Sequence, residues 1–292
     1  MTSQDLSLTR PQVSRTKILW QRFSRNRAAV LGLILFIAVV LIALLADVIT
    51  PGDPLRRTGD PLVWPFLNAA TPLGTDQLGR DIMAGIFHGA RISLLIGVVA
   101  TLISIVIGII IGALAGYYGG WVDDVLMRIT EAFQTVPGFL LALALVSIAG
   151  PSLPVLIAAI ALSSWTQAAR LTRGQVLSIR ESDYVASARV IGMHPMEIAF
   201  RQILPNALPP VLALAPVIVA SAILIEAALS FLGLSDLNRV SWGGMIAEGR
   251  AVLRSAPWLS ILPGLALALT VVGVYLTGEG LTNSLSRREV QS

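Results

Sequence analysis

The sequence predicts an all-α polytopic membrane protein with six transmembrane helices. Of its 292 residues, 55% are hydrophobic and only 13% are charged, whereas a soluble domain carries about 25% charged residues. Several apolar runs approach or exceed the roughly 20 residues that a helix needs to cross the hydrocarbon core. The 21 Lys and Arg residues gather at the ends of these runs. This distribution follows the positive-inside rule and excludes a nucleic-acid binder.

The first predicted span is the apolar stretch 28–46, which follows a basic N-terminal tail over 1–27. A cleavable signal peptide has an apolar core of about 7–15 residues. The stretch is longer than that, so it is interpreted as a span that the protein retains. A polar loop rich in Pro, Gly and Asp follows over 47–91 and is predicted to lie outside the cell.

Five further spans are predicted within a core over 92–282, ahead of a short C-terminal tail over 283–292. Gly150, Pro151 and Ser152 form a turn signal in the middle of this core. The spans are predicted at 92–117, at 121–150 with a kink at Pro137, and at 153–165, 207–229 and 258–276.

The charge distribution decides whether 139–165 holds one span or two. With two spans and an inner N-terminus, the inner segments hold 14 Lys and Arg residues and the outer segments hold 7. With one span, the inner segments hold 10 Lys and Arg residues and the outer segments hold 11. Positive charge in short loops sets the orientation. The sequence therefore predicts six spans with both termini in the cytoplasm.

Catalytic and metal chemistry is not expected in this chain. There is no cysteine, so a disulfide and a thiol nucleophile are excluded. There are only two histidines, which disfavours a His/Cys metal site. The chain lacks a Gly-x-x-x-x-Gly-Lys-Ser/Thr phosphate loop, and its single lysine is Lys17 in the tail. Any nucleotide hydrolysis must therefore occur in another protein.

Two intramembrane features are candidate functional elements. Gly108, Gly112 and Gly116 form a small-residue stripe in span 2 that allows another helix to approach closely. The stripe fits either packing within the chain or a seam with a partner subunit. Glu226 lies within span 5, where a carboxylate is costly. It either lines a transport pathway or is hydrogen-bonded to a neighbouring helix.

The polar segment between spans 4 and 5 is the most informative part of the sequence. Residues 180–206 are predicted to form a short helix of small and charged residues, a turn at Gly192, a second helix, and a return to the membrane at Pro205. An ordinary connector between spans does not need this length or its own helical pattern. The segment is therefore interpreted as a surface on which another protein binds.

This segment resembles the EAA loop of ATP-binding-cassette (ABC) importer permeases, whose pattern is Glu-Ala-Ala, three residues, Gly and, further on, Ile-x-Leu-Pro. Ala186 stands where the pattern has Glu, and Ser187 replaces its first Ala. The matches in register are Ala188, Gly192, Leu204 and Pro205. The resemblance implies contact with an ATPase subunit through Tyr184, Ala186, Ser187, Ala188, Arg189, Gly192, Leu204 and Pro205.

A second resemblance covers Leu73–Asp81, which reads Leu-Gly-Thr-Asp-Gln-Leu-Gly-Arg-Asp. It is similar to the Leu-Gly-Thr-Asp-x-x-Gly-Arg-Asp signature of the C-type permease in dipeptide, oligopeptide and nickel importers. Further matches occur in the same order at 119–123, 229–233, 241–243 and 278–281. The chain thus resembles this family over nearly its whole length, which implies the type I ABC importer permease fold.

The resemblance also implies a function and a set of partners. It implies half of a translocation pathway for peptides, completed by a second permease subunit in the bacterial inner membrane. Two cytoplasmic ATPase subunits would hold ATP and Mg²⁺, an external solute-binding protein would deliver the cargo, and this chain would carry no cofactor. The alternative cargo is nickel, glutathione or another small solute. An ion-gradient-driven transporter would need paired intramembrane charges, and only Glu226 is expected clearly at depth.

Overall fold

A computed structural model describes residues 15–286, with the side chains of residues 20–284. The regular secondary structure in this part of the chain is helical, which confirms the predicted all-α class. The described helices are α1 (Arg15–Arg25), α2 (Arg27–Ile49), α3 (Ile82–Tyr118), α4 (Gly120–Thr135), α5 (Gly138–Ala149), α6 (Leu153–Arg180), α7 (Asp183–Val190), α8 (Pro195–Ile198), α9 (Leu204–Ala213), α10 (Ala215–Phe231), α11 (Trp242–Gly249) and α12 (Trp258–Ser286), with a π-helical turn at Ala199–Ile203 and a 3-10 turn at Arg250–Val252.

Four of the described helices are long and apolar enough to cross a membrane, namely α2, α3, α6 and α12. Two bent pairs add to these: α4 with α5, which meet at 83°, and 195–213 with α10, which meet at 45°. If each bent pair is one span, the chain has six spans, as the sequence predicts. The first bend lies at Pro137, where the missing N–H and fixed φ of proline interrupt a helix.

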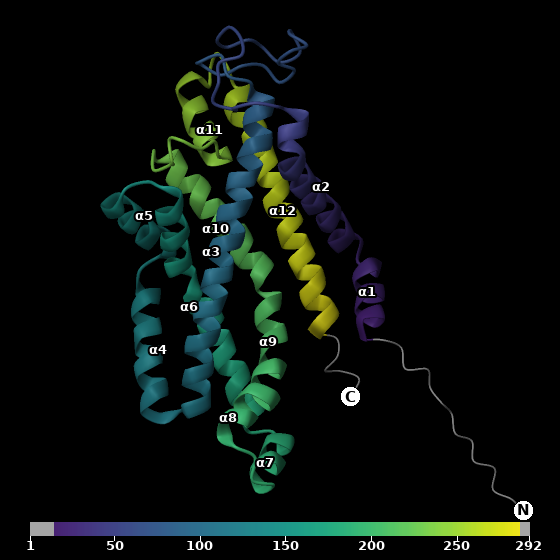
Figure 1. Cartoon of the computed structure of the whole chain (residues 1–292), viewed down its shortest axis with the longest axis vertical. Coiled ribbons are helices and arrows are strands. Elements are labelled where there is room, and N and C mark those ends of the chain that lie inside the picture. Colours follow the sequence, from purple (N-terminus) through teal and green to yellow (C-terminus); the bar gives the residue numbers. More distant parts are fainter. Residues whose placement is uncertain (1–14, 287–292) are drawn as a thin grey trace, which may run out of the picture.

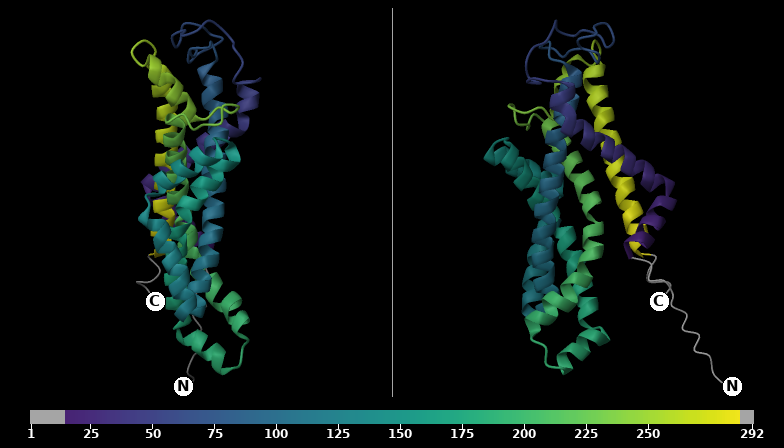
Figure 2. Two further views of the ribbon diagram at one scale, coloured as in Figure 1. Left: turned by 90° about the vertical axis from the view of Figure 1, so that its left-hand side faces the viewer. Right: turned by 45° about the vertical axis from the view of Figure 1, so that its right-hand side comes forward.

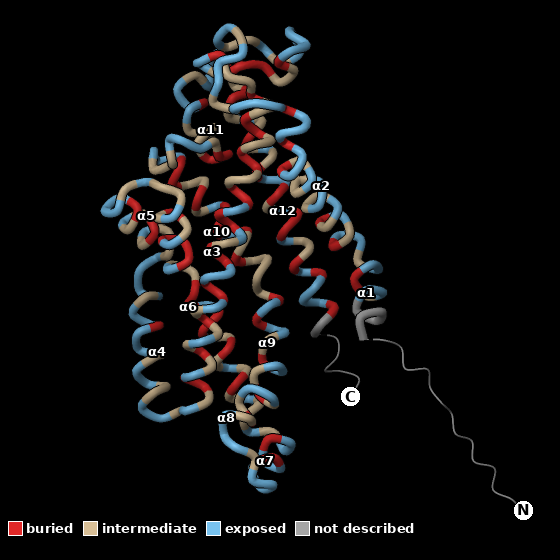
Figure 3. The backbone as a smooth tube through the Cα atoms, in the orientation of Figure 1, coloured by how far each residue is buried: buried red, intermediate tan, exposed pale blue. Residues whose placement is uncertain are grey.

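The helices form an elongated bundle around α3 (Figures 1 and 2). At 37 residues and 1.5 Å per residue, α3 is about 55 Å long. It packs along α6 and α10, while α2 packs along α12. The loop 50–81 and α11 lie at one end of the bundle, and α7 and α8 lie at the other. Buried residues follow the contacts among α3, α6 and α10, whereas α4 is mostly exposed (Figure 3).

The helix α3 begins at Ile82, ten residues before the predicted start of span 2. Asp81 caps it by accepting a hydrogen bond from the Met83 N–H at 2.9 Å. Arg91 interrupts the apolar run without ending the helix, because its guanidinium pairs with Asp47 at 2.7 Å and donates to the Leu44 carbonyl of α2. The polar loop is therefore shorter than the predicted 47–91.

The helix α6 continues to Arg180, well beyond the predicted end of span 4 at residue 165. Arg170 and Arg173 form hydrogen bonds with α4, and Arg180 donates to the end of α3. These contacts let α6 continue through its later polar residues. The helix α12 likewise continues to Ser286, beyond the predicted start of the tail at residue 283. The predicted basic N-terminal tail lies partly outside the described residues, as does the end of the C-terminal tail.

Candidate functional site

Residues 180–206, called the coupling loop below, form a compact unit at one tip of the bundle (Figure 1). They hold α7, a turn, α8 and the start of α9. Gly192 makes the turn with a φ of +82°, in the left-handed region that disfavours a side chain. Two polar contacts fix the loop to the end of α3. The Tyr117 hydroxyl donates to the Pro195 carbonyl at 2.6 Å, and Arg180 donates to the Tyr117 carbonyl at 2.9 Å.

The coupling loop has its own small hydrophobic core. Val185 and Ala188 lie one helical turn apart on α7, so they share the face that packs inward. The remaining members of this core are Val176, Ile198, Ile203 and Ala207. Ala188 was predicted to face a partner protein, but within this chain it packs into the core of the loop and only 6% of the residue is exposed.

The outer surface of the coupling loop is apolar at its tip. Val190 is 89% exposed and Ile191 is 80% exposed, which is unusual for side chains of this kind at a polar membrane surface. Met196 and Phe200 are also exposed, and they line a hollow beside the end of α3. The other candidate residues on the outside are Tyr184, Ala186, Ser187, Arg189, Gly192 and Pro205, with Leu204 partly buried.

The glycine stripe of α3 packs against α6 within the chain. A Cβ atom added at Gly108, Gly112 or Gly116 would meet atoms of α6 at 2.9 Å or less. At Gly108 the nearest atoms are those of Ala168, and at Gly116 they are those of Arg173 and Val176. Of the two interpretations, packing within the chain is the one that the structure shows.

Glu226 is enclosed between helices and is only 1% exposed. The Ser230 hydroxyl donates to its Oε1 at 2.8 Å, and the Ser93 hydroxyl lies 3.4 Å from its Oε2. Ser93 in turn accepts from the backbone N–H of Trp242 at 3.3 Å. Glu226 therefore joins α10 to α3 and, through Ser93, to α11. The hydrogen-bonded interpretation fits this position, and the carboxylate does not face open space.

The signature segment Leu73–Asp81 builds the opposite end of the bundle. Asp76 accepts from the Leu78 and Arg80 N–H groups at 2.8 Å, so its carboxylate holds the turn together. Gln77 donates to the Glu248 carbonyl at 2.8 Å, and the Arg80 guanidinium lies 3.8 Å from the Glu248 carboxylate. Burial raises the pKa of Glu248, and the charge of Arg80 opposes that rise. These contacts tie the signature loop to α11.

A polar face on α6 was not predicted as a functional element. Ser163, Gln167, Arg170 and Gly174 are spaced four, three and four residues apart, so they lie along one side of the helix. We call this side the pathway face. It borders a hollow of about 510 Å³ at the bend between α4 and α5. The helical spacing was visible in the sequence, but the predicted end of span 4 at residue 165 divided it.

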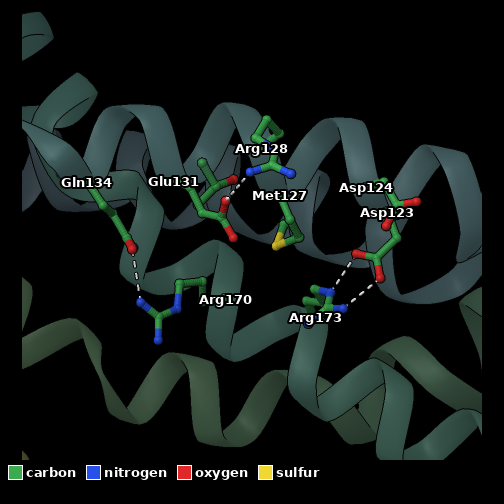
Figure 4. A pocket seen from close by; sticks show the side chains of 9 residues that line it. Asp123, Asp124, Met127, Arg128, Glu131, Gln134, Arg170 and Arg173 are labelled. Atoms are coloured by element: carbon green, nitrogen blue, oxygen red, sulfur yellow. Dashed lines mark hydrogen bonds and ion pairs between the residues drawn. The ribbon is translucent and has the colours of Figure 1, made fainter.

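No group of three or more His, Asp or Glu side chains within the described part of the chain could hold a metal ion. Asp123 lies in the first turn of α4 and accepts hydrogen bonds from Nε and Nη2 of Arg173, at 2.5 and 2.6 Å. This bidentate pair joins α4 to α6 (Figure 4).

The chain belongs to the family described as the binding-protein-dependent transport system inner membrane component, which matches residues 104–291. Residues 14–67 match a second family, the N-terminal transmembrane domain of oligopeptide transport permease C. These matches confirm the predicted C-type permease. The chain is a multi-pass membrane subunit of a bacterial ABC importer and not an enzyme, and the family carries no cofactor of its own.

Curated relatives cover nearly the whole chain. The di/tripeptide transport system permease protein DppC of Pseudomonas aeruginosa is 38% identical over 97% of this chain and 95% of its own length. The oligopeptide transport system permease protein OppC of Escherichia coli K12 is 37% identical over 93% of this chain and 92% of its own length. The dipeptide transport system permease protein DppC of Alkalihalophilus pseudofirmus is 37% identical over 94% of this chain and 90% of its own length.

A solved structure confirms the predicted fold. A chain of the MetNI methionine ABC transporter in an inward-facing conformation superimposes with a TM-score of 0.59. It covers 70% of this chain and 97% of its own length, with 18% sequence identity. The likeness concerns the fold alone.

Proposed function

We propose that this chain is one of two permease subunits in an ABC importer of dipeptides and oligopeptides. The names of its relatives support this cargo, because three peptide permeases are 37–38% identical to it over more than nine-tenths of its length. The observation that carries the mechanism is the coupling loop, a folded tip whose outer surface holds the exposed apolar residues Val190 and Ile191. Neighbouring apolar side chains this exposed are typical of a surface on which a partner protein binds.

The partner at this tip is proposed to be a cytoplasmic ATPase subunit, one for each permease. ATP and Mg²⁺ bind there and not in the permease. The tip is anchored to α3 through Tyr117 and continues directly into α9, so a movement of the tip is passed to two spans. Closure of the ATPase pair would thereby change which side of the pathway is open.

The opposite end of the bundle is proposed to receive an external solute-binding protein. The loop 50–81 and α11 lie there and are held together by the contacts of Gln77 and Arg80 with Glu248. In this proposal both termini and the coupling loop lie in the cytoplasm, which is the orientation that the distribution of Lys and Arg residues favours.

The cargo is tested by uptake into cells that lack their own peptide importers and express the complete set of subunits. We expect accumulation of a radiolabelled dipeptide that depends on this chain and on ATP. Labelled nickel and glutathione, the alternative cargoes, are measured in parallel. Uptake of nickel or glutathione without uptake of any peptide would show that the proposed cargo is wrong.

The coupling mechanism is tested by placing tryptophan at two neighbouring positions of α7. Ala186 is exposed and Ala188 is buried in the core of the loop. Ala186→Trp should release the ATPase and abolish transport while the loop stays folded and resists protease. Ala188→Trp should also abolish transport, but by overpacking the core and exposing the loop to protease. Normal transport by Ala186→Trp would show that the ATPase does not bind this surface.

A further inference from the structure

Two arginines on the same helix have different electrostatic environments (Figure 4). Arg173 forms a bidentate pair with Asp123, so its charge is balanced within the chain. Arg170, one helical turn away, donates from Nη1 to the Gln134 Oε1 at 2.9 Å. Among the described residues it has no ion pair. Its positive charge and most of its five N–H donors are thus available.

The position of Arg170 along the bundle is level with the uncharged part of α3. The helix α3 carries no Asp, Glu, Lys or Arg between Arg91 and Asp123. Ala169, the neighbour of Arg170, contacts α3 at Gly112. Gly112 lies six residues, or about 9 Å, before the end of α3 at Tyr118. Arg170 therefore lies beside the uncharged part of α3, towards the end of the bundle that holds the coupling loop. A charge without an ion pair at such a place marks a substrate or ion pathway.

The side chain of Arg170 lines a hollow and does not lie in the contact between α6 and α3. The hollow at the bend of α4 and α5 is lined by Gln134, Gln167 and Arg170, with Ser163 and Ser221 further along it. A smaller neighbouring hollow is lined by Gln134, Gln167 and Arg170 again. In both hollows Arg170 is the one charged lining residue. The opposite face of α6 is apolar and packs on the glycines of α3, so the two faces of this helix have separate roles.

We propose that Arg170, Gln134 and Gln167 form a carboxylate-binding subsite that holds the C-terminal carboxylate of a peptide in transit. The inference rests on the proposed function. A guanidinium binds a carboxylate through two parallel N–H donors. The side-chain amides of the two glutamines can each donate a further hydrogen bond. A Lys side chain would keep the positive charge but could not form the two parallel hydrogen bonds.

The same charge disfavours the alternative metal cargo. Neither of these two hollows has a lining carboxylate, so a divalent cation there would be repelled by Arg170. Arg170 also borders an adjoining hollow of about 800 Å³ that is lined by Asp123, Asp124 and Glu131, where Asp123 is already paired with Arg173. A peptide brings its own negative charge and balances the arginine while it passes. The contact must be weak enough for release into the cytoplasm, as in any conduction pathway. The subsite therefore selects cargo with a free carboxylate.

The charge of the subsite can be measured without any transport. The chain contains no cysteine, so Gln167→Cys introduces a single thiol into it beside Arg170. The purified complex is treated with a negatively and a positively charged methanethiosulfonate of similar size, and labelling of this subunit is followed by mass. We expect the anionic reagent to react at least about fivefold faster, and the ratio to fall towards one when Arg170→Gln is added. Arg128→Gln is the matched control, since the Arg128 side chain is 86% exposed and pairs with Glu131.

Transport by the reconstituted complex measures the role of the subsite. The substrates are a tripeptide and its C-terminal amide, chosen so that both saturate the solute-binding protein. We expect wild type to move the free acid about tenfold faster than the amide. Arg170→Gln should lower transport of the free acid to the rate of the amide, and Arg170→Lys should restore part of it. ATP hydrolysis that the loaded binding protein stimulates should persist in both variants.

The outcomes separate the subsite from the proposed function. A labelling ratio that Arg170→Gln does not change would overturn the subsite, and would point instead to an acidic residue of the second permease that pairs with Arg170. An acid-to-amide ratio that stays at the wild-type value in Arg170→Gln would also overturn it. In a further outcome, wild type transports no peptide although the labelling ratio still depends on Arg170. That result would show that the proposed peptide cargo is wrong, while it would support an anion-binding subsite at Arg170.

Discussion

Gly192 illustrates what the sequence predicts well at the scale of single residues. A glycine between two short helical patterns indicated a turn, and the structure has one with a φ of +82°. Ala188 illustrates the opposite, because its orientation depends on how the coupling loop folds onto itself around Val185. Arg170 was visible in the sequence, but its importance depends on the contrast with Arg173. That contrast appears only when Asp123 of another helix is in place.

The turn at Gly192 gives a prediction that separates backbone strain from steric fit. The space around Gly192 is open, so a Cβ atom meets nothing within 4 Å, and only the positive φ opposes a side chain. Gly192→Ala should destabilise the loop by about 1–2 kcal/mol. Gly192→Pro should abolish transport, because proline fixes φ near −65° and removes the N–H that Gly192 donates to the Arg189 carbonyl at 3.0 Å.

The measurement is peptide uptake and ATPase activity of the reconstituted complex, with the amount of subunit in the membrane as an expression control. Gly264→Ala in α12 is the matched control for the added methyl group, since it also meets open space and does not have a positive φ. Equal transport by wild type and Gly192→Pro would show that the turn is not needed for coupling.

At the scale of helices, the sequence predicted which segments are helical better than where they end. Apolar runs locate α3 and α6 because burial in lipid requires them, but a helix ends where its backbone groups find other partners. Arg91 of α3 and Arg173 of α6 continue their helices because Asp47 and Asp123 accept their hydrogen bonds. Those partners lie far away in the sequence, so hydropathy placed both boundaries at the wrong residues.

The contact between α3 and α6 gives a prediction about close packing. A Cβ atom at Gly112 would overlap the Ala169 carbonyl and the Thr172 side chain of α6. The overlapping carbonyl belongs to the backbone of α6, which can shift only at a cost in free energy. Gly112→Ala should therefore destabilise the subunit by about 1–3 kcal/mol, and Gly112→Leu should prevent the two helices from packing.

Thermal unfolding of the purified subunit in detergent measures this effect. Gly264→Ala in α12 is the matched control, because nothing in the described residues lies within 4 Å of a Cβ atom there. We expect a melting temperature close to that of wild type for the control and a clear decrease for both Gly112 variants. A wild-type melting temperature for Gly112→Leu would contradict the close approach of α3 and α6.

At the scale of the whole molecule, composition and charge were sufficient for the class of protein and the number of spans. They could not place the pathway face, because the hollow beside Arg170 is formed by α4, α5 and α6 together with α10. The bend of 83° between α4 and α5 opens that hollow, and no periodicity encodes such an angle. The two ends of the bundle are distinct in structure, with the signature loop at one and the coupling loop at the other.

The last prediction concerns which end of the bundle lies in the cytoplasm. The coupling loop, the N-terminal tail and the C-terminal tail together carry most of the Lys and Arg residues, so we expect all three in the cytoplasm. A reporter that is active only outside the cytoplasm should be inactive when fused after Gly192 and active when fused after Asp60 in the opposite loop. An active reporter at Gly192 would reverse the topology, and the tip with Val190 and Ile191 could then not bind a cytoplasmic ATPase.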